Sequence, residues 1–192
     1  MRLIGVTGQM GSGKTTVVKW LGQLGAEVID ADEITHKLMQ KAFVKKSIVN
    51  NFGENILKKG KIDRRILSKQ VFSSKRKLKM LCSIVHPLII KEIMHRIKKS
   101  RYNYVVIDAP LLIESGLHKM MDKVLVVFAD MKTLIKRCVK KGFDANDAKM
   151  RIRSQMPLKN RIKFADYVID NNGSIGKTKK NVIKIWRELK YR

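Results

Sequence analysis

The residues best suited to chemistry form a short glycine-rich run close to the N-terminus. The run has the pattern G-x-x-x-x-G-K-[ST] and consists of Gly8, Gln9, Met10, Gly11, Ser12, Gly13, Lys14 and Thr15. In such a loop the glycines let backbone N–H groups turn inward around phosphate groups, and the lysine reaches the terminal phosphates. The threonine hydroxyl is suited to Mg²⁺. The pattern therefore predicts a phosphate-binding loop, or P-loop.

The segments on either side of the run are those that a P-loop requires. Leu3 to Val6 are apolar and partly β-branched, which predicts a buried strand that ends at Thr7-Gly8. Apolar residues at helical spacing predict a helix from Lys14, whose N-terminus adds a partial positive charge. This context favours a phosphate site over the alternative, a glycine-rich turn that only packs tightly.

The next predicted strand spans Glu27 to Asp30. One aspartate is its last residue, and a second, Asp32, lies two residues later. Asp30 and Asp32 are two residues apart, so both side chains lie on one face if the strand geometry persists. Ligands of open α/β sheets bind at this end of the strands, and a kinase needs a base there beside its acceptor hydroxyl. The alternatives are a strand terminator or helix cap for Asp30, and the N-cap of a helix beginning near Glu33 for Asp32.

Three further apolar runs, at 104–107, 124–128 and 167–169, each end in an acid or a turn. Together with the first two runs they predict an α/β fold, a P-loop three-layer sandwich with a five-stranded parallel sheet. About 70 residues with helical periodicity separate the second and third strands, far more than one crossover helix needs. A second helical and basic insertion spans 131–164, where many phosphotransferases carry a mobile lid.

Composition narrows the class of protein. The 192 residues include 42 Lys+Arg against 16 Asp+Glu, and the net charge of +26 attracts polyanions such as nucleotides, nucleic acid or acidic membranes. Cys82 and Cys138 form neither a disulfide framework nor a metal cluster, which favours a reducing cytosol. No stretch approaches the roughly 18 apolar residues of a membrane span, so we expect a cytoplasmic protein with no membrane partner.

Short motifs along almost the whole chain resemble those of the dephospho-CoA kinase family. They are I-G-V-T-G-Q-M-G-S-G-K-T-T at 4–16, D-A-D at 30–32, G-K-I-D-R-R at 60–65, I-V-H-P at 84–87, D-A-P-L-L-I-E-S-G at 108–116, R-I-R-S-Q-M-P at 151–157 and A-D-Y-V-I-D-N-N-G-S at 165–174. Single motifs such as H-P are weak, but this order and spacing are specific. The resemblance implies an enzyme that uses ATP and Mg²⁺ to phosphorylate the ribose 3′-hydroxyl of dephospho-CoA, giving coenzyme A and ADP in the final step of CoA biosynthesis.

The resemblance also implies how the chain is divided and which groups react. It implies a core of 1–32, 102–130 and 165–192, a helical insertion at 33–101 that binds the CoA substrate, and a lid at 131–164. Asp32 matches the family acid that accepts the hydroxyl proton, and Lys14 steadies the transferring phosphoryl group. Asp108 matches an acid that holds Mg²⁺ through water beside Thr15; the alternative is a strand-end cap facing Pro110.

Further residues match positions that the resemblance implies for the two substrates. For ATP they are Gly8, Gly11, Ser12, Gly13, Lys14, Thr15, Thr16, Arg137, Lys141, Asn172 and Gly173. For the acceptor nucleotide they are Asp30, Asp32, Arg64, His86, Asp108 and Arg151. An arginine can grip the pyrophosphate of this acceptor with two hydrogen bonds. A helix start would also explain His86 before Pro87, and loop chemistry would explain 171–173.

The predicted lid departs from the pattern of the family that it resembles. Family lids commonly carry R-x-x-x-R, or one residue longer, just before a glycine, whereas this chain reads K-R-C-V-K-K-G at 136–142. Lysine is a point charge and cannot form the same fork as arginine. We expect Arg137 to be the catalytic lid arginine, with Lys140, Lys141 and Arg151 as alternatives for the phosphate contact. A lid is still expected, because a kinase must exclude water.

Two other functions remain as alternatives. A nucleic-acid-binding P-loop protein would explain the charge of +26, but aromatic residues are only 6% and no recognisable RNA or DNA module interleaves them with the basic residues. Another small kinase, acting on a nucleoside monophosphate, shikimate or gluconate, would explain the P-loop. The long helical insertion, with D-A-D before it and H-P within it, favours a large acceptor.

Overall fold

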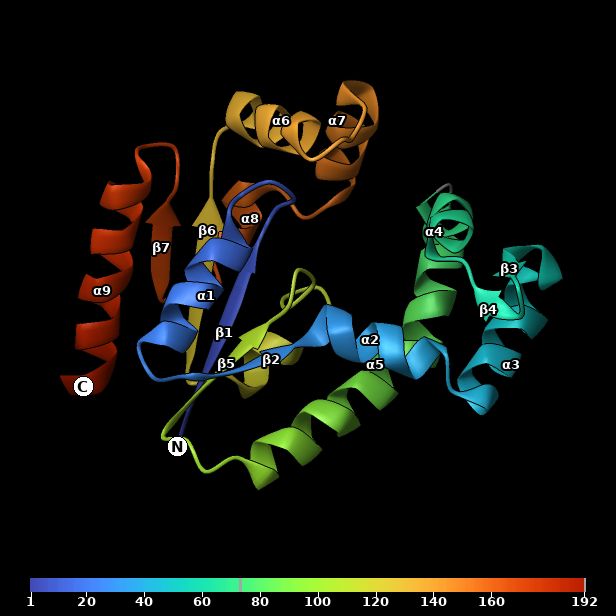
Figure 1. The fold of residues 1–192 in the computed structure, drawn as a ribbon, viewed down its shortest axis with the longest axis horizontal. Helices are drawn as coiled ribbons and strands as arrows, with labels where there is room; N and C mark the ends of the chain where they lie inside the picture. Colours follow the sequence, from blue (N-terminus) through green and yellow to red (C-terminus); the bar gives the residue numbers. More distant parts are fainter. Residues whose placement is uncertain (73, 192) are drawn as a thin grey trace. The chain divides into compact units, whose positions relative to one another are not determined.

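The computed structural model describes residues 1–72 and 74–191, and the chain forms two compact units (Figure 1). The first unit comprises Met1–Asp30 and Ser100–Arg192, and the second comprises Ala31–Lys99. The finer division into core, insertion and lid stays a prediction. Among the described residues, no helix is both long enough and apolar enough to cross a membrane.

The first unit is built on a five-stranded parallel sheet. Its strands are β1 (Arg2–Gly8), β2 (Glu27–Asp30), β5 (Tyr104–Asp108), β6 (Lys123–Phe128) and β7 (Tyr167–Asp170), in the spatial order β2-β5-β1-β6-β7. All four neighbouring pairs are parallel. The predicted α/β fold with five parallel strands is therefore confirmed, and the central strand β1 carries the P-loop at its carboxyl end.

Successive residues of a strand point to opposite faces of the sheet, so the apolar strands present two faces that helices can cover. Ile4 and Val6 of β1 share one core with α1 (Lys14–Gln23) and α9 (Ile175–Tyr191). Gly5 faces the other way, where a Cβ would lie 2.5 Å from the Leu112 side chain. Four more elements complete the unit: η2 (Leu117–Met120), α6 (Met131–Lys140), α7 (Ala145–Ser154) and α8 (Leu158–Ile162).

The second unit is mainly helical. It contains α2 (Ala31–Met39), α3 (Ala42–Phe52), η1 (Glu54–Ile56), β3 (Leu57–Lys58), β4 (Lys61–Ile62), α4 (Arg64–Phe72) and α5 (Lys75–Lys99). The short antiparallel pair β3–β4 was not predicted. Its two turn residues, Lys59 and Gly60, both have positive φ, at 50° and 72°. This geometry suits a tight hairpin whose backbone matches the twist of the strands.

Two structural alternatives for residues of the second unit were wrong. Helix α2 begins at Ala31, so Asp32 lies inside its first turn and is not the N-cap of a helix that starts near Glu33. Pro87 lies inside α5, so His86 does not mark a helix start. In both cases the helix extends further towards the N-terminus than its local boundary signals indicated.

Candidate active site

The P-loop joins β1 to α1 and closes on itself through its own backbone. The Ser12 N–H donates to the Gln9 carbonyl at 3.0 Å, and Gly13 at the N-cap of α1 has a φ of 90°. Only glycine adopts this left-handed conformation without strain. Ser12 is 1% exposed, and its hydroxyl has no hydrogen-bond partner among the described residues. A buried, unpaired hydroxyl in a glycine-rich loop fits the binding of a phosphate group.

Two acids lie at the carboxyl edge of the sheet, and one of them pairs with Lys14. Asp108 ends β5 and Asp30 ends β2, and the register of the two strands places these residues opposite each other. The Lys14 ammonium forms an ion pair with the carboxylate of Asp108, a residue that is only 6% exposed. Burial raises the pKa of Asp108, the charge of Lys14 opposes this shift, and the charge of Asp30 adds to it. The edge thus holds a lysine and two carboxylates directly beside the P-loop.

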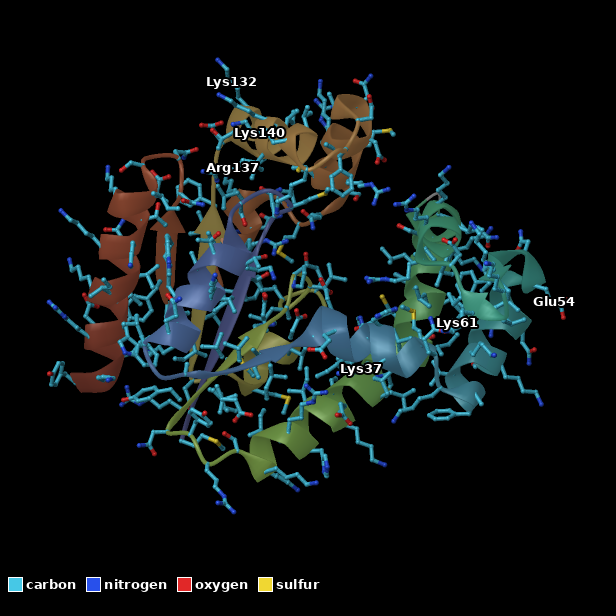
Figure 2. All side chains as sticks on the ribbon, in the orientation of Figure 1. Lys37, Glu54, Lys61, Lys132, Arg137 and Lys140 are labelled. Atoms are coloured by element: carbon cyan, nitrogen blue, oxygen red, sulfur yellow. The ribbon has the colours of Figure 1, made fainter. Side chains whose placement is uncertain are left out.

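The opposite side of the P-loop contacts Arg137 of α6 and the loop that follows β7. One Arg137 nitrogen donates to the Asn171 carbonyl at 2.8 Å, and the other lies 3.4 Å from the Ser12 carbonyl and 3.5 Å from that of Gly11. The Asn171 side-chain amide donates to the Ser12 carbonyl at 2.7 Å. In Figure 2, Arg137 points towards the P-loop, whereas Lys132 of the same helix extends away from it.

The Asn171 side chain forms its hydrogen bonds within the protein. Its side-chain oxygen accepts a hydrogen bond from the Thr178 hydroxyl at 2.8 Å, and the residue is 9% exposed. A Cβ on Gly13 would lie 2.0 Å from the Asn171 amide nitrogen, so this packing requires glycine in the P-loop. The β7–α9 loop is therefore joined to the P-loop by a side chain that loop chemistry alone does not explain.

Other predicted ATP-binding residues of the first unit lie at its surface. Thr15 and Thr16 are exposed in the first turn of α1, and Lys141 is exposed directly after α6. Gly173 is exposed, and Asn172 uses its side chain to accept from the Asp130 N–H and to donate to Asp170. The Asn172 backbone N–H also donates to the Asp170 carboxylate at 2.9 Å, so both polar groups of the side chain and this N–H bond within the protein.

Arg151 has a different environment from the one expected of a phosphate ligand. Its Nε lies 3.0 Å from both carboxylate oxygens of Asp147, one turn earlier in α7. Its guanidinium also lies 5.7 Å from the centre of the Phe143 ring. Both partners belong to the α6–α7 hairpin, so the structure ties Arg151 to its own segment.

Three of the predicted residues belong to the second unit. Asp32 is exposed in the first turn of α2, and Arg64 is exposed at the first residue of α4. His86 is half-buried in α5, and burial lowers the pKa of its imidazole below the ordinary histidine value. His86 is therefore mainly neutral at pH 7, which suits hydrogen bonding better than charge pairing. The roles of these three residues stay predictions.

The sequence reasoning missed a buried arginine beneath the P-loop. Arg161 of α8 is 0% exposed and donates to the Thr7 hydroxyl at 2.6 Å and to the Pro110 carbonyl at 3.0 Å. Its other terminal nitrogen forms an ion pair with Glu114 at 2.9 Å. Arg161 thus joins the residue before Gly8 to the loop that follows Asp108. A signal existed in Glu114, the one acid in the otherwise apolar run L-L-I-E, but nothing local pointed to Arg161.

The chain is similar to known proteins in both sequence and fold. A family model described as dephospho-CoA kinase matches residues 2–177. The dephospho-CoA kinase of Aquifex aeolicus is 41% identical over 192 residues, covering 98% of both chains. A solved dephospho-CoA kinase from Campylobacter jejuni superposes with a TM-score of 0.69 at 31% identity, covering 97% of this chain and 96% of that one. A shikimate kinase from Acinetobacter baumannii superposes with a TM-score of 0.58 at 17% identity, covering 98% of this chain and 93% of that one, and shows likeness of fold alone.

Proposed function

Since the chain belongs to the dephospho-CoA kinase family of ATP-dependent phosphotransferases, we propose that it transfers the γ-phosphoryl group of ATP to the ribose 3′-hydroxyl of dephospho-CoA. The products are coenzyme A and ADP. The observation that carries the proposal is the ion pair of the P-loop Lys14 with Asp108 at the carboxyl edge of the sheet, where Asp30 lies opposite Asp108. A phosphoryl-transfer enzyme needs such positioning and charge stabilisation rather than covalent chemistry of its own.

In the proposed reaction Asp32 accepts the proton of the 3′-hydroxyl. The hydroxyl oxygen forms a bond to the γ-phosphorus while the bond from this phosphorus to the β–γ bridging oxygen breaks, and ADP leaves. Lys14 and the backbone N–H groups of the P-loop stabilise the negative charge on the transferring group. Arg137 adds charge stabilisation from α6, where it contacts the Gly11 and Ser12 carbonyls of the P-loop.

Residues of the first unit also fit Mg²⁺. The ion prefers oxygen ligands, keeps several waters and binds through one or two protein groups together with substrate phosphates. The Thr15 hydroxyl and the Asp108 carboxylate are such groups, with Asp108 acting through water. Mg²⁺ bound there would neutralise charge on the phosphates.

The remaining predicted residues complete the two substrate sites in the proposal. Ser12, Thr16, Lys141, Asn172 and Gly173 contact ATP together with the P-loop glycines. Asp30, Arg64, His86 and Arg151 contact the acceptor nucleotide. Because Cys82 and Cys138 are free thiols, we also propose a cytosolic location.

The test measures ADP release with ATP and Mg²⁺, in the presence and absence of dephospho-CoA, for wild type and Asp32→Asn. We expect dephospho-CoA to be required, and kcat to fall by about 10²–10⁴ in Asp32→Asn, as is typical for loss of a general base. Glu33→Gln is the matched control, because Glu33 is the next exposed acid of α2, and it keeps wild-type turnover. ADP release that is indifferent to dephospho-CoA would mean that the P-loop serves an ATPase or a different acceptor.

A further inference from the structure

The chain leaving α7 reaches the P-loop through Gln155. Its side-chain oxygen accepts a hydrogen bond from the Met10 N–H at 2.9 Å. Gln9 extends in the opposite direction, and its side-chain amide lies 3.5 Å from the Ile152 carbonyl in the last turn of α7. The second contact is long, so the Gln155–Met10 bond is the main polar link between α7 and the P-loop.

This hydrogen bond completes the support of one peptide unit. The Gln9 carbonyl and the Met10 N–H belong to the same peptide plane and point in opposite directions. The carbonyl accepts from the Ser12 N–H at 3.0 Å, and the N–H donates to Gln155 at 2.9 Å. A rotation of this plane breaks both bonds at once, so Gln155 fixes the orientation in which the Ser12 N–H is held.

Packing holds the same residue from its side chain. Met10 packs against a small core shared by α6 and α7, whose buried members are Ala129, Leu134, Cys138, Ala148 and Ile152. At the next residue, a Cβ on Gly11 would lie 2.7 Å from the Leu134 carbonyl of α6. The α6–α7 hairpin therefore contacts the P-loop by backbone, side chain and a directed hydrogen bond.

We propose that Gln155 is a positioning residue for ATP, which acts on the P-loop by holding the Met10 N–H. The proposal rests on the function proposed above only in that the nucleotide is ATP. A neutral amide suits this place, because it supplies an accepting oxygen without adding negative charge close to the phosphates. Because the Met10 N–H is already bonded to Gln155, the proposal assigns Gln155 the role of shaping the site without touching substrate.

The test compares Gln155→Met, which keeps the length of the side chain but removes the acceptor, with wild type. Loss of one hydrogen bond predicts a rise in the KM for ATP and the Kd for ADP of about 3- to 10-fold, with the KM for dephospho-CoA unchanged. Ser154→Ala is the matched control, because its hydroxyl donates only to the Arg151 carbonyl within α7. It leaves all three constants within about twofold of wild type.

Hydrogen exchange gives a readout that does not depend on the acceptor. In Gln155→Met the Met10 and Ser12 amides exchange faster than in wild type, whereas Gln155→Glu, which keeps an accepting oxygen, restores their protection. An unchanged ADP affinity in Gln155→Met, or an equal rise in both KM values, would overturn the proposal. Wild-type enzyme that does not use dephospho-CoA would refute the proposed function alone, because ADP binding by calorimetry still tests Gln155.

Discussion

The two sides of the P-loop are built from different kinds of interaction. On the side of β5 and β2, Lys14 is paired with the buried Asp108, and Asp30 lies opposite in the register. On the side of α6, α7 and the β7–α9 loop, Gln155 and Asn171 hold P-loop backbone groups through neutral amides. The charged groups that suit reaction with phosphate therefore gather on one side, and the groups that fix the shape of the loop gather on the other.

This difference has a physical reason. Backbone N–H groups that surround a phosphate must stay oriented, and a hydrogen bond from a neutral amide orients a peptide without changing the local charge. A carboxylate in the same place would repel the phosphates, whereas one beside Lys14 is compensated. Arg137 is the exception, because it brings a positive charge to the shaping side, where it bonds the Asn171 carbonyl.

The largest effect is expected on the charged side, from Lys14→Met. In the proposed mechanism Lys14 donates to the transferring phosphoryl group, and we expect the loss of one such preorganised donor to lower kcat by about 10²–10³. The change also leaves the Asp108 carboxylate buried without its ammonium partner, so the pKa of Asp108 rises further. Steady-state kinetics with ATP and dephospho-CoA measure the loss. Lys19→Met, which changes an exposed lysine of the same helix, is the control, and we expect it to keep wild-type rates. A Lys14→Met enzyme that retains more than a tenth of wild-type kcat would contradict the assignment of the reactive charges to this side of the P-loop.

A smaller effect is expected on the shaping side, from Gly11→Ala. Gly11 has a φ of 82°, and an added Cβ would meet the Leu134 carbonyl at 2.7 Å, so α6 must shift. We expect a loss of about 2–4 kcal/mol in the free energy of unfolding, measured by urea titration, together with a higher KM for ATP. Gly142→Ala is the matched control, because its φ of 85° brings similar strain but nothing lies within 4 Å of the new Cβ.

The control isolates the contact from the backbone strain. Gly142→Ala costs about 1 kcal/mol and leaves the KM for ATP at the wild-type value. Equal losses of stability in the two variants would show that α6 does not press on the P-loop. An unchanged KM for ATP in Gly11→Ala would separate the fold of the hairpin from the shape of the phosphate site.

The sheet and the charged side of the site could be predicted because their signals are local. Apolar runs that end in an acid or a turn located all five strands. The carboxyl ends of parallel strands meet at one edge, which places Asp30 and Asp108 near the P-loop. The P-loop pattern alone predicted that Lys14 belongs to the phosphate site. The strand order β2-β5-β1-β6-β7 was not predicted, because it depends on pairings between distant segments.

On the shaping side, Arg137 and the loop at 171–173 were predicted from the family resemblance, but their contacts were not, because these contacts join residues far apart in the chain. Gln155 lies 145 residues after Met10, and Asn171 lies 159 residues after Ser12. Arg161, beneath the P-loop, likewise lies 154 residues after Thr7. Glutamine and arginine near helix ends are ordinarily exposed, so their residue types gave no signal. Arg151 is different: its spacing of four from Asp147 is a local pattern for a helical ion pair, and this could have been read beforehand.

The smallest effect concerns a charge that belongs to the shaping side but lies at its surface. Asp130 is the N-cap of α6 and accepts from the Thr133 N–H at 2.7 Å. This hydrogen bond, with the charges of Lys132 and Arg137, lowers the pKa of Asp130 below the ordinary aspartate value. Because the folded pKa is below the unfolded one, the stability that Asp130 contributes is present above the unfolded pKa and is lost as the pH falls through the folded pKa.

Asparagine caps a helix as well as aspartate does but has no charge to lose, so Asp130→Asn isolates the titration from the cap. We expect the urea midpoint to fall slightly less between pH 7 and pH 3 in Asp130→Asn than in wild type, and the difference to shrink at high salt because the carboxylate is exposed. We also expect kcat at pH 7 to stay within about twofold of wild type. A tenfold lower kcat would place a second charge needed for catalysis, besides Arg137, on the side that the structure assigns to shape, and the separation between the two sides of the P-loop would then fail.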